Sequence, residues 1–297
     1  MNPIGKERKI IDPRKVIYGT ARFGDFGYGN SFTNPDPHDK IIETILELGI
    51  RRIDTAARYG SAEKILGKFS SLFPTDFTFD TKIDNLNINS SDLYEYLKME
   101  VGRSFDRLKT DQIGTLYIHE NDIISSPHLI ENLKKLKSFF PIEKIGTSIY
   151  STTELEFCLS EELYDTIQIP MNLISRGFYN IIRNRDVGRK EIIARSVFLQ
   201  GILASSSLDY IQSLDGSLYK SVSEAEIICK KYNSTLLNET IRFIDETGLK
   251  FIIGSTSKRN IINGLAYELN DTVDLIENEL FPLIDKQFTY TNPRTWK

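Results

Sequence analysis

Short apolar runs alternate with longer segments of helical periodicity along most of the chain. The apolar residues of these runs do not alternate cleanly with polar ones, which is typical of parallel strands covered on both faces. Each run ends in polar residues, and a helical segment follows. The pattern predicts eight strands, at Val16–Ala21, Arg51–Thr55, Thr78–Ile83, Ile113–His119, Glu143–Ile149, Thr166–Met171, Ile192–Phe198 and Lys250–Ser255.

The segments that follow these strands have apolar residues three or four positions apart, as one face of a helix requires. Two of them begin with recognisable start signals. Ser90-Ser91-Asp92 is a plausible cap, and Ser126 precedes Pro127 at a tolerated first-turn position. The predicted helices are Asp39–Leu48, Ser61–Phe69, Ser91–Leu108, Pro127–Phe139, Thr153–Ser160, Phe178–Asp186, Glu224–Tyr232, Leu236–Glu246, Lys258–Leu269 and Val273–Lys286.

Strands that alternate with helices pair in parallel through right-handed crossovers, so the fold class is α/β. Eight repeats predict closure into a (β/α)8 TIM barrel, which typically needs about 250 residues. No Pro/Gly/Ser-rich linker divides the chain, so we expect one barrel domain over residues 1–297. The alternative is an open doubly wound sheet, which favours Gly-x-Gly-x-x-Gly after the first strand. Gly19 and Gly24 do not have that spacing.

Composition narrows the class of protein. The net charge of −4 gives no electrostatic reason to expect nucleic acid or an anionic membrane as partner. The N-terminus has no apolar signal-peptide core, and no run approaches the length of a membrane span. Two cysteines, expected as reduced core thiols, fit the cytoplasm. With three histidines and no Cys-x-x-Cys pair, we expect no metal site.

Ionisable side chains follow three successive predicted strands. Asp54 and then Tyr59 end the second strand, Lys82 ends the third, and His119 ends the fourth. In a β/α barrel the active site lies at the C-terminal ends of the strands, so these four side chains can converge. Any one of them alone would more often be structural. Four at adjacent strand ends favour catalysis.

This set suits proton delivery to a carbonyl that is being reduced by hydride. A tyrosine hydroxyl can deliver the proton if its pKa falls from about 10 toward the working range. The ammonium of Lys82 would favour the phenolate of Tyr59, and Asp54 would hold Lys82 charged and in place. His119 would orient the carbonyl oxygen or relay a proton.

Asp54-Thr55-Ala56 followed by Tyr59-Gly60, Glu63 and Leu66-Gly67 resembles the signature of the aldo-keto reductases. Lys82 and His119 fall where that family keeps its other catalytic residues. A closer likeness is to a bacterial subgroup with a GTAQFG-like start and an RSVFLQG seventh strand, often associated with surface-polysaccharide or sugar biosynthesis. The corresponding segments here are Gly19–Gly24 and Arg195–Gly201. The resemblance implies a barrel, a proton-donating tyrosine and NAD(P)H bound without a Rossmann fold.

The resemblance also implies where the cofactor binds. Ser148 and Gln168 would hold the nicotinamide carboxamide, and the segment that begins the helix after the eighth strand would hold the adenosine end. Backbone N–H groups and cations at such a helix start suit a phosphate. The expected cofactor-binding residues are Gly19, Thr20, Ser148, Gln168, Arg195, Ser196, Leu199, Gly201, Gly254, Ser255, Thr256, Lys258 and Arg259.

Several positions depart from the family pattern. Ile149 replaces an Asn that would contact the carboxamide, and Arg195 replaces the aromatic residue that stacks on the nicotinamide. Arg195 could stack there through its guanidinium plane or pair with a carboxylate. Gly254 and Asn260 replace a Lys and an Arg at the adenosine end, and Asn263-Gly264 replaces a Glu-Asn pair. We therefore expect NADP(H), with NAD(H) as the alternative.

Other residues have open assignments. Phe26 and Tyr28 in the first loop could stack on a ring or only pack, and Arg176 and Tyr179 could contact substrate or lie on the surface. The favoured function is an NAD(P)H-dependent oxidoreductase that reduces an aldehyde, a ketone or a sugar derivative. The alternatives are a nicotinamide-binding regulatory subunit similar to potassium-channel beta subunits, and a non-redox barrel enzyme such as a lyase.

Overall fold

Eight parallel strands close into a barrel in the computed structural model, which describes residues 7–24, 35–72, 77–120, 122–205, 211–213, 215–269 and 271–283. The strands follow one another around the barrel in chain order, and the last pairs with the first, Val16 opposite Phe251. This confirms the predicted (β/α)8 TIM barrel. The barrel strands are β2 (Val16–Gly19), β3 (Arg52–Asp54), β4 (Thr78–Ile83), β5 (Ile113–Ile118), β6 (Ile142–Ser148), β7 (Tyr164–Pro170), β8 (Glu191–Arg195) and β9 (Lys250–Ile253).

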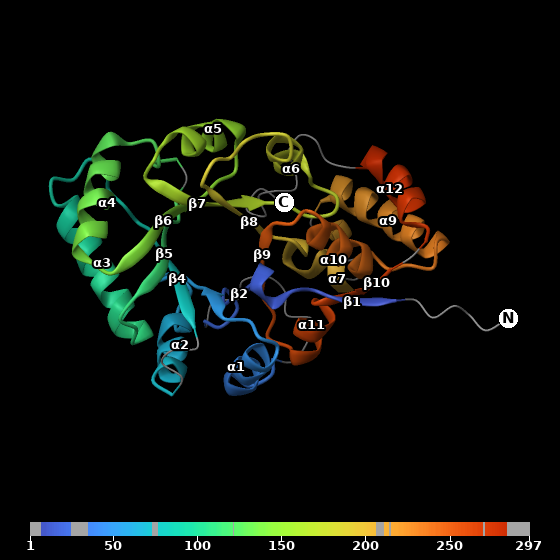
Figure 1. Ribbon diagram of the computed structural model, residues 1–297, viewed down its shortest axis with the longest axis horizontal. Coiled ribbons are helices and arrows are strands. Elements are labelled where there is room, and N and C mark those ends of the chain that lie inside the picture. Colours follow the sequence, from blue (N-terminus) through green and yellow to red (C-terminus); the bar gives the residue numbers. More distant parts are fainter. Residues whose placement is uncertain are drawn as a thin grey trace.

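Helices surround this barrel, with α1 to α5 along one side and α9, α10 and α12 gathered on the other (Figure 1). Caps explain where some of them begin: the Ser126 hydroxyl, at a predicted helix start, accepts from the Leu129 N–H, and Ser151 forms a capping box with Glu154 that the sequence analysis did not name. The α-helices are α1 (His38–Glu47), α2 (Ala62–Ser70), α3 (Leu93–Leu108), α4 (Pro127–Phe139), α5 (Thr152–Ser160), α6 (Gly177–Ile182), α7 (Ile202–Ser205), α9 (Gly216–Lys231), α10 (Leu236–Glu246), α11 (Lys258–Asn263) and α12 (Val273–Leu280).

A two-stranded antiparallel ribbon of β1 (Arg8–Ile10) and β10 (Ala266–Glu268) lies outside the barrel. The sequence pattern predicted neither strand, and the predicted helix Lys258–Leu269 is wrong in its second half. The backbone of 266–268 pairs with Arg8–Ile10, and the buried Tyr267 hydroxyl donates to the carboxylate of Asp245. This tertiary pairing overrides the local helical periodicity.

Among the other boundaries that differ from the prediction, two have a local cause in the structure. Helix α9 begins at Gly216, eight residues before the predicted start at Glu224, because Asp215 caps it by accepting from the N–H groups of Ser217 and Leu218. Strand β8 ends at Arg195 rather than Phe198, since Ser196 takes a left-handed φ of 59° that no strand can continue.

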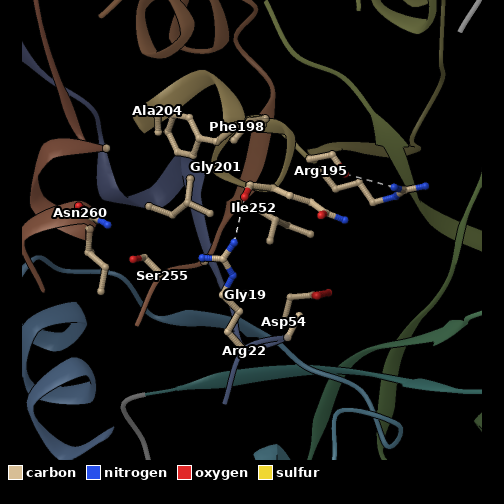
Figure 2. A pocket seen from close by; sticks show the side chains of 18 of the residues that line it. Gly19, Arg22, Asp54, Arg195, Phe198, Gly201, Ala204, Ile252, Ser255 and Asn260 are labelled. Carbon is tan, nitrogen blue, oxygen red and sulfur yellow. Dashed lines mark hydrogen bonds between the residues drawn. The ribbon is translucent and has the colours of Figure 1, made fainter. Parts of the chain in front are cut away.

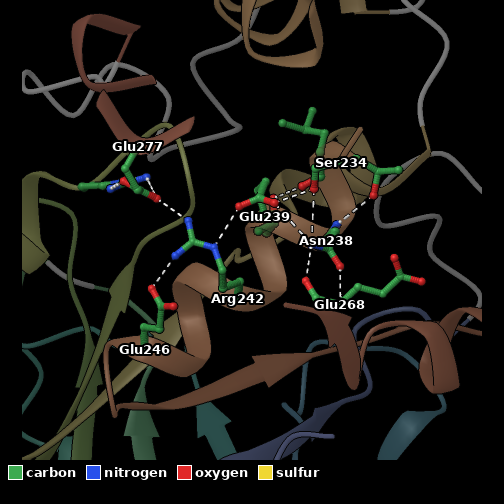
Figure 3. Close-up of polar contacts among 11 residues, drawn as sticks. Ser234, Asn238, Glu239, Arg242, Glu246, Glu268 and Glu277 are labelled. Carbon is green, nitrogen blue, oxygen red and sulfur yellow. Dashed lines mark hydrogen bonds and ion pairs between the residues drawn. The ribbon is translucent and has the colours of Figure 1, made fainter. Parts of the chain in front are cut away.

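Helices α10 and α12 are joined by a buried charge network around Arg242, whose side chain is 1% exposed. Its guanidinium donates to Glu239 at 2.8 Å, to Glu246 at 2.5 Å and to Glu277 of α12 at 2.6 Å (Figure 3). Arg176, after β7, pairs with Glu277 at 2.7 Å. The network fixes the C-terminal helix against the barrel. Among the residues described, no helix has the length and apolarity to cross a membrane.

Candidate active site

Asp54 and Lys82 meet at the C-terminal end of the barrel. Asp54 is the last residue of β3, and Lys82 lies near the end of the neighbouring β4. The Lys82 ammonium donates to both carboxylate oxygens of Asp54, at 2.5 Å to Oδ2, and to the Thr55 carbonyl at 2.8 Å. Both side chains are buried. Three acceptors therefore hold the ammonium at a fixed place.

Tyr59 and His119 close the group around this ammonium. Lys82 Nζ lies 5.4 Å from the centre of the Tyr59 ring, and the His119 ring stands perpendicular to Tyr59 with the ring centres 6.0 Å apart. The backbone N–H of His119 donates to the Ile83 carbonyl at 3.0 Å, and this hydrogen bond joins the end of β5 to the end of β4. The structure thus brings all four predicted catalytic residues to the wall of one cavity.

Gly24 determines how closely the first loop approaches Tyr59. A Cβ at Gly24 would lie 2.0 Å from the Tyr59 carbonyl oxygen, too close for any side chain. Glycine is therefore required where the first loop packs against the turn that carries Tyr59.

Opposing effects act on the protonation of Lys82. Burial alone would lower the pKa of Lys82, but the Asp54 carboxylate, with smaller help from Asp80, raises it above its ordinary value. The ammonium therefore stays charged. Gln168 on β7 donates to Asp54 Oδ2 at 2.9 Å, so this carboxylate is also held from across the barrel.

The cavity has a volume of about 680 Å³ and extends from Asp54 to Asn260 of α11 (Figure 2). Its size lies within the range of small-molecule and cofactor pockets. Nine of the thirteen predicted cofactor-binding residues line it: Gly19, Ser148, Gln168, Arg195, Ser196, Gly201, Gly254, Ser255 and Arg259. Their cofactor contacts stay predictions.

The other four predicted cofactor-binding residues do not line the cavity. Thr20 and Leu199 are fully buried, and the Thr20 hydroxyl contacts the Asp54 carbonyl at 3.2 Å. Thr256 is 8% exposed, and Lys258 is the first residue of α11. All four are neighbours in sequence of residues that do line the cavity.

Arg195 lies against an aromatic ring rather than a carboxylate. Its guanidinium carbon is 4.2 Å from the centre of the Tyr150 ring, and Nη2 donates to the Ile149 carbonyl at 3.0 Å. No carboxylate of the described residues forms an ion pair with it. The Ile149 side chain is fully buried, so this position presents its carbonyl, not its side chain, to Arg195.

The loop after β8 has an unusual backbone where it borders the cavity. Ser196, Leu199 and Gln200 all have φ between 48° and 59°, and Gly201 has 97°. Such clusters of left-handed residues occur mainly at functional sites. Figure 2 shows Arg22 reaching toward this loop, where its Nη2 donates to the Gln200 carbonyl at 3.0 Å. Arg22 thereby links the loop after β2 to the loop after β8.

The adenosine end of the predicted site has two features that the sequence did not reveal. A Cβ at Gly254 would lie 2.5 Å from the Gly19 carbonyl oxygen, so no lysine fits at Gly254. The Lys258 N–H, expected to face a phosphate, donates to the carboxylate of Asp36 at 2.7 Å, and the Asp36 N–H donates to the Thr256 carbonyl at 2.7 Å.

The open assignments are resolved in part. Arg176 does not line the cavity: it is 8% exposed, bonds Glu277 and lies 4.0 Å from the centre of the Phe243 ring. Tyr179 packs edge-on against the same ring. Both have structural contacts there. Phe26 and Tyr28 lie outside the described residues.

Sequence reasoning missed several residues of the cavity wall. Arg22, Phe198 and Gln200 belong to the two motifs that carried the resemblance, so those motifs contained the signal. Leu237 of α10 lies far from any motif in sequence, and only the fold brings it to the wall.

The wall fits a dinucleotide. Near Asp54 it carries the amide of Gln168 and the hydroxyl of Ser148, and at the far end it carries hydroxyls, amides and Arg259. The glycines at 19 and 254 let two strands approach closely at the mouth. Donors spaced along an elongated cavity match a ligand with polar groups at both ends.

Comparison with known proteins agrees with this geometry. The model of the aldo/keto reductase family matches residues 15–272. The chain is 24% identical to D-arabinose 1-dehydrogenase of Saccharomyces cerevisiae over 70% of this chain and 68% of that protein. It is also 24% identical to the uncharacterized oxidoreductase YqkF of Bacillus subtilis, over 75% and 76%.

Solved structures share the fold. The aldo-keto reductase AKR11C1 from Bacillus halodurans has a TM-score of 0.72 at 17% identity over 95% of this chain and 97% of its own. The glycerol dehydrogenase AKR11B4 from Gluconobacter oxydans has a TM-score of 0.66 at 20% identity over 91% and 92%. With the family model matching most of its length, this chain belongs to the aldo/keto reductase family.

Proposed function

We propose that this enzyme reduces the carbonyl group of an aldehyde, a ketone or a sugar derivative to an alcohol, with Tyr59 as the proton donor and NADP(H) as the cofactor. The observation that carries the proposal is the position of the charged Lys82, clamped by Asp54 and 5.4 Å from the Tyr59 ring in the wall of the large cavity.

Bound NAD(P)H supplies the hydride. The protein must then deliver a proton to the oxygen that becomes an alkoxide. The hydroxyl of Tyr59 donates this proton, and the nearby ammonium of Lys82 stabilises the phenolate that remains. Asp54 and Gln168 keep the ammonium in place, and His119 orients the carbonyl oxygen beside Tyr59.

Ser148 and Gln168 would hold the carboxamide, and Arg195 would lie against the nicotinamide ring with its other face on Tyr150. Ser255 and Arg259 would hold the adenosine end. The preference for NADPH over NADH rests on the side chains of Lys258 and Arg259. It no longer rests on the Lys258 N–H, because Asp36 already accepts that hydrogen bond.

The names of two similar proteins support a polyhydroxylated substrate, since one is a D-arabinose dehydrogenase and the other a glycerol dehydrogenase. A sugar-derived aldehyde or ketone is therefore the substrate class we propose.

The experiment is a titration with NADPH and NADH, followed by turnover on a panel of simple aldehydes, ketones and sugar aldehydes. The proposal expects cofactor binding and carbonyl-dependent oxidation of the reduced cofactor. Tight cofactor binding with no turnover on any carbonyl would instead support a nicotinamide-binding regulatory subunit.

A further inference from the structure

The barrel interior below the active site is polar, whereas β/α barrels are usually filled by Val, Ile and Leu. Arg52, the first residue of β3, joins several of its polar groups. The guanidinium donates to Asp80 at 2.7 Å, to Glu191 at 2.9 Å and to Thr115 at 3.2 Å. Glu191 is also bonded by Lys144 at 3.0 Å and by Lys250 at 2.7 Å. The positive charge of Arg52 is thus shared between two carboxylates.

Asp80 is the member of this group that lies next to the active site. It precedes Lys82 by two residues on β4, so both side chains face the barrel interior. In the β3–β4 register its Cα partner is Asp54. The same short stretch of barrel therefore holds the Asp54 carboxylate, which binds the Lys82 ammonium, and the Asp80 carboxylate, whose charge also acts on it.

The Asp80 carboxylate is fully buried and held on one side only. Oδ2 accepts from Arg52, while Oδ1 has no hydrogen-bond partner within the described part of the chain. A buried carboxylate usually has its oxygens satisfied. A single hydrogen-bonding side chain leaves much of the Asp80 charge directed at the groups around it.

The charged and titratable groups that face Asp80 are Arg52 and Asp54 from β3, Lys82 from β4 and Tyr117 from β5, with Glu191 of β8 beyond Arg52. Burial, with a smaller contribution from the Asp54 charge, raises the pKa of Asp80 to about 6, although Arg52 and Lys82 act in the opposite direction. Asp80 is therefore ionised under alkaline conditions.

We propose that Asp80 is a positioning residue: its carboxylate, held by Arg52 beneath Lys82, opposes the positive potential at Tyr59 and so sets the pH above which carbonyl reduction is lost. The inference rests on the proposed function of Tyr59. It concerns a residue outside the cavity wall, which contacts neither substrate nor cofactor.

The sign of the effect follows from the charges. The Asp80 carboxylate disfavours a phenolate at Tyr59, so removing it makes loss of the Tyr59 proton easier. The alkaline limb of the pH profile for reduction must then move to lower pH. A unit charge within the barrel, at an effective dielectric of about 20, shifts such a limb by about one pH unit.

The test is the pH profile of kcat/KM for reduction in Asp80→Asn. We expect the alkaline limb to move down by about one pH unit. If Asp80→Asn does not fold, Asp80→Thr makes the same test, since threonine is neutral and suits a strand. The control is Asp245→Asn. This residue is also buried, with ion pairs to Lys9 at 2.9 Å and Lys15 at 2.8 Å, but it lies on α10. Asp245→Asn should reduce stability and leave the alkaline limb of the pH profile unchanged.

A second readout does not depend on turnover. The near-ultraviolet phenolate absorbance of each protein, minus that of its Tyr59→Phe counterpart, reports the ionisation of Tyr59 alone. The proposal expects this ionisation to move down in the Asp80 variant by the same amount as the kinetic limb. The proposal is overturned if the Asp80 variant loses stability but neither its Tyr59 ionisation nor the alkaline limb of its pH profile moves. If Tyr59→Phe keeps full turnover, the proposed function fails instead, and the absorbance still tests Asp80.

Discussion

At the residue scale, three charged residues of the proposed site differ in how their charges are compensated. Lys82 has three acceptors in Asp54 and Thr55, so its charge is compensated. The Arg195 guanidinium contacts the Tyr150 ring and the Ile149 carbonyl, and it forms no ion pair among the described residues. Lys258 has its N–H, not its side chain, engaged by Asp36. Each of these differences gives a separate prediction.

Lys82→Met should reduce both stability and activity. The buried Asp54 carboxylate then has no counter-charge, and breaking such a pair costs about 3–5 kcal/mol in the free energy of unfolding. Chemical denaturation measures this cost. The double variant Asp54→Leu with Lys82→Met should recover most of the stability but none of the activity. A stable and active Lys82→Met would contradict the proposed role of the pair.

Arg195→Tyr should change the balance between oxidised and reduced cofactor. The oxidised nicotinamide ring is cationic, so a guanidinium at about 4 Å costs around 1 kcal/mol even with water-like screening, about a fivefold effect on affinity. The tyrosine should therefore tighten the oxidised cofactor relative to the reduced one. Titrations of both forms on both proteins measure the ratio. An unchanged ratio would show that Arg195 does not lie against the nicotinamide.

The nucleotide preference should respond to charges at the start of α11. Lys258→Ala with Arg259→Ala should narrow the difference between the dissociation constants for NADPH and NADH, since only NADPH carries the 2′-phosphate that they would meet. Asp36→Asn should widen it, because a negative charge at that point is lost. Equal dissociation constants for the two cofactors in the wild-type protein would count against the predicted preference.

At the scale of elements, the sequence predicted the strands better than the segments outside the barrel. Each barrel strand is an apolar run whose position follows from its own residues. Asp54, Lys82 and His119 therefore lie at or next to the strand ends where the sequence predicted them. The ribbon of β1 and β10 was missed because its pairing depends on two segments far apart in sequence. The cavity contact of Leu237 was missed for the same reason.

The docking of α12 gives a prediction at this scale. Arg242→Met should lower the free energy of unfolding by about 3 kcal/mol or more, because Glu239 is fully buried and would lose its cation. Lys135→Met is the control: its ion pair with Glu131 is exposed on both sides and should contribute less than about 1 kcal/mol. Equal unfolding free energies for the two variants would show that the buried network does not secure α12.

At the scale of the whole molecule, the barrel collects at one end the residues that the chain places after successive strands. The meeting of Asp54, Tyr59, Lys82 and His119 could be predicted because the ends of parallel strands meet in a closed barrel. The cavity wall was predicted only in part: Thr20, Leu199, Thr256 and Lys258 belong to motifs that border the cavity, but these four residues do not line it. A motif predicts which loop borders the cavity, but the direction of each side chain depends on the local backbone. The left-handed residues after β8 illustrate this.

We propose that Tyr59 delivers the proton, and Tyr59→Phe isolates this role because the ring stays and only the hydroxyl is removed. The measurement is kcat for carbonyl reduction on the best substrate of the panel, together with the dissociation constant of the reduced cofactor. We expect kcat to fall by about 100-fold or more, the scale of general acid catalysis, with cofactor affinity unchanged. Near-wild-type turnover by Tyr59→Phe would contradict it.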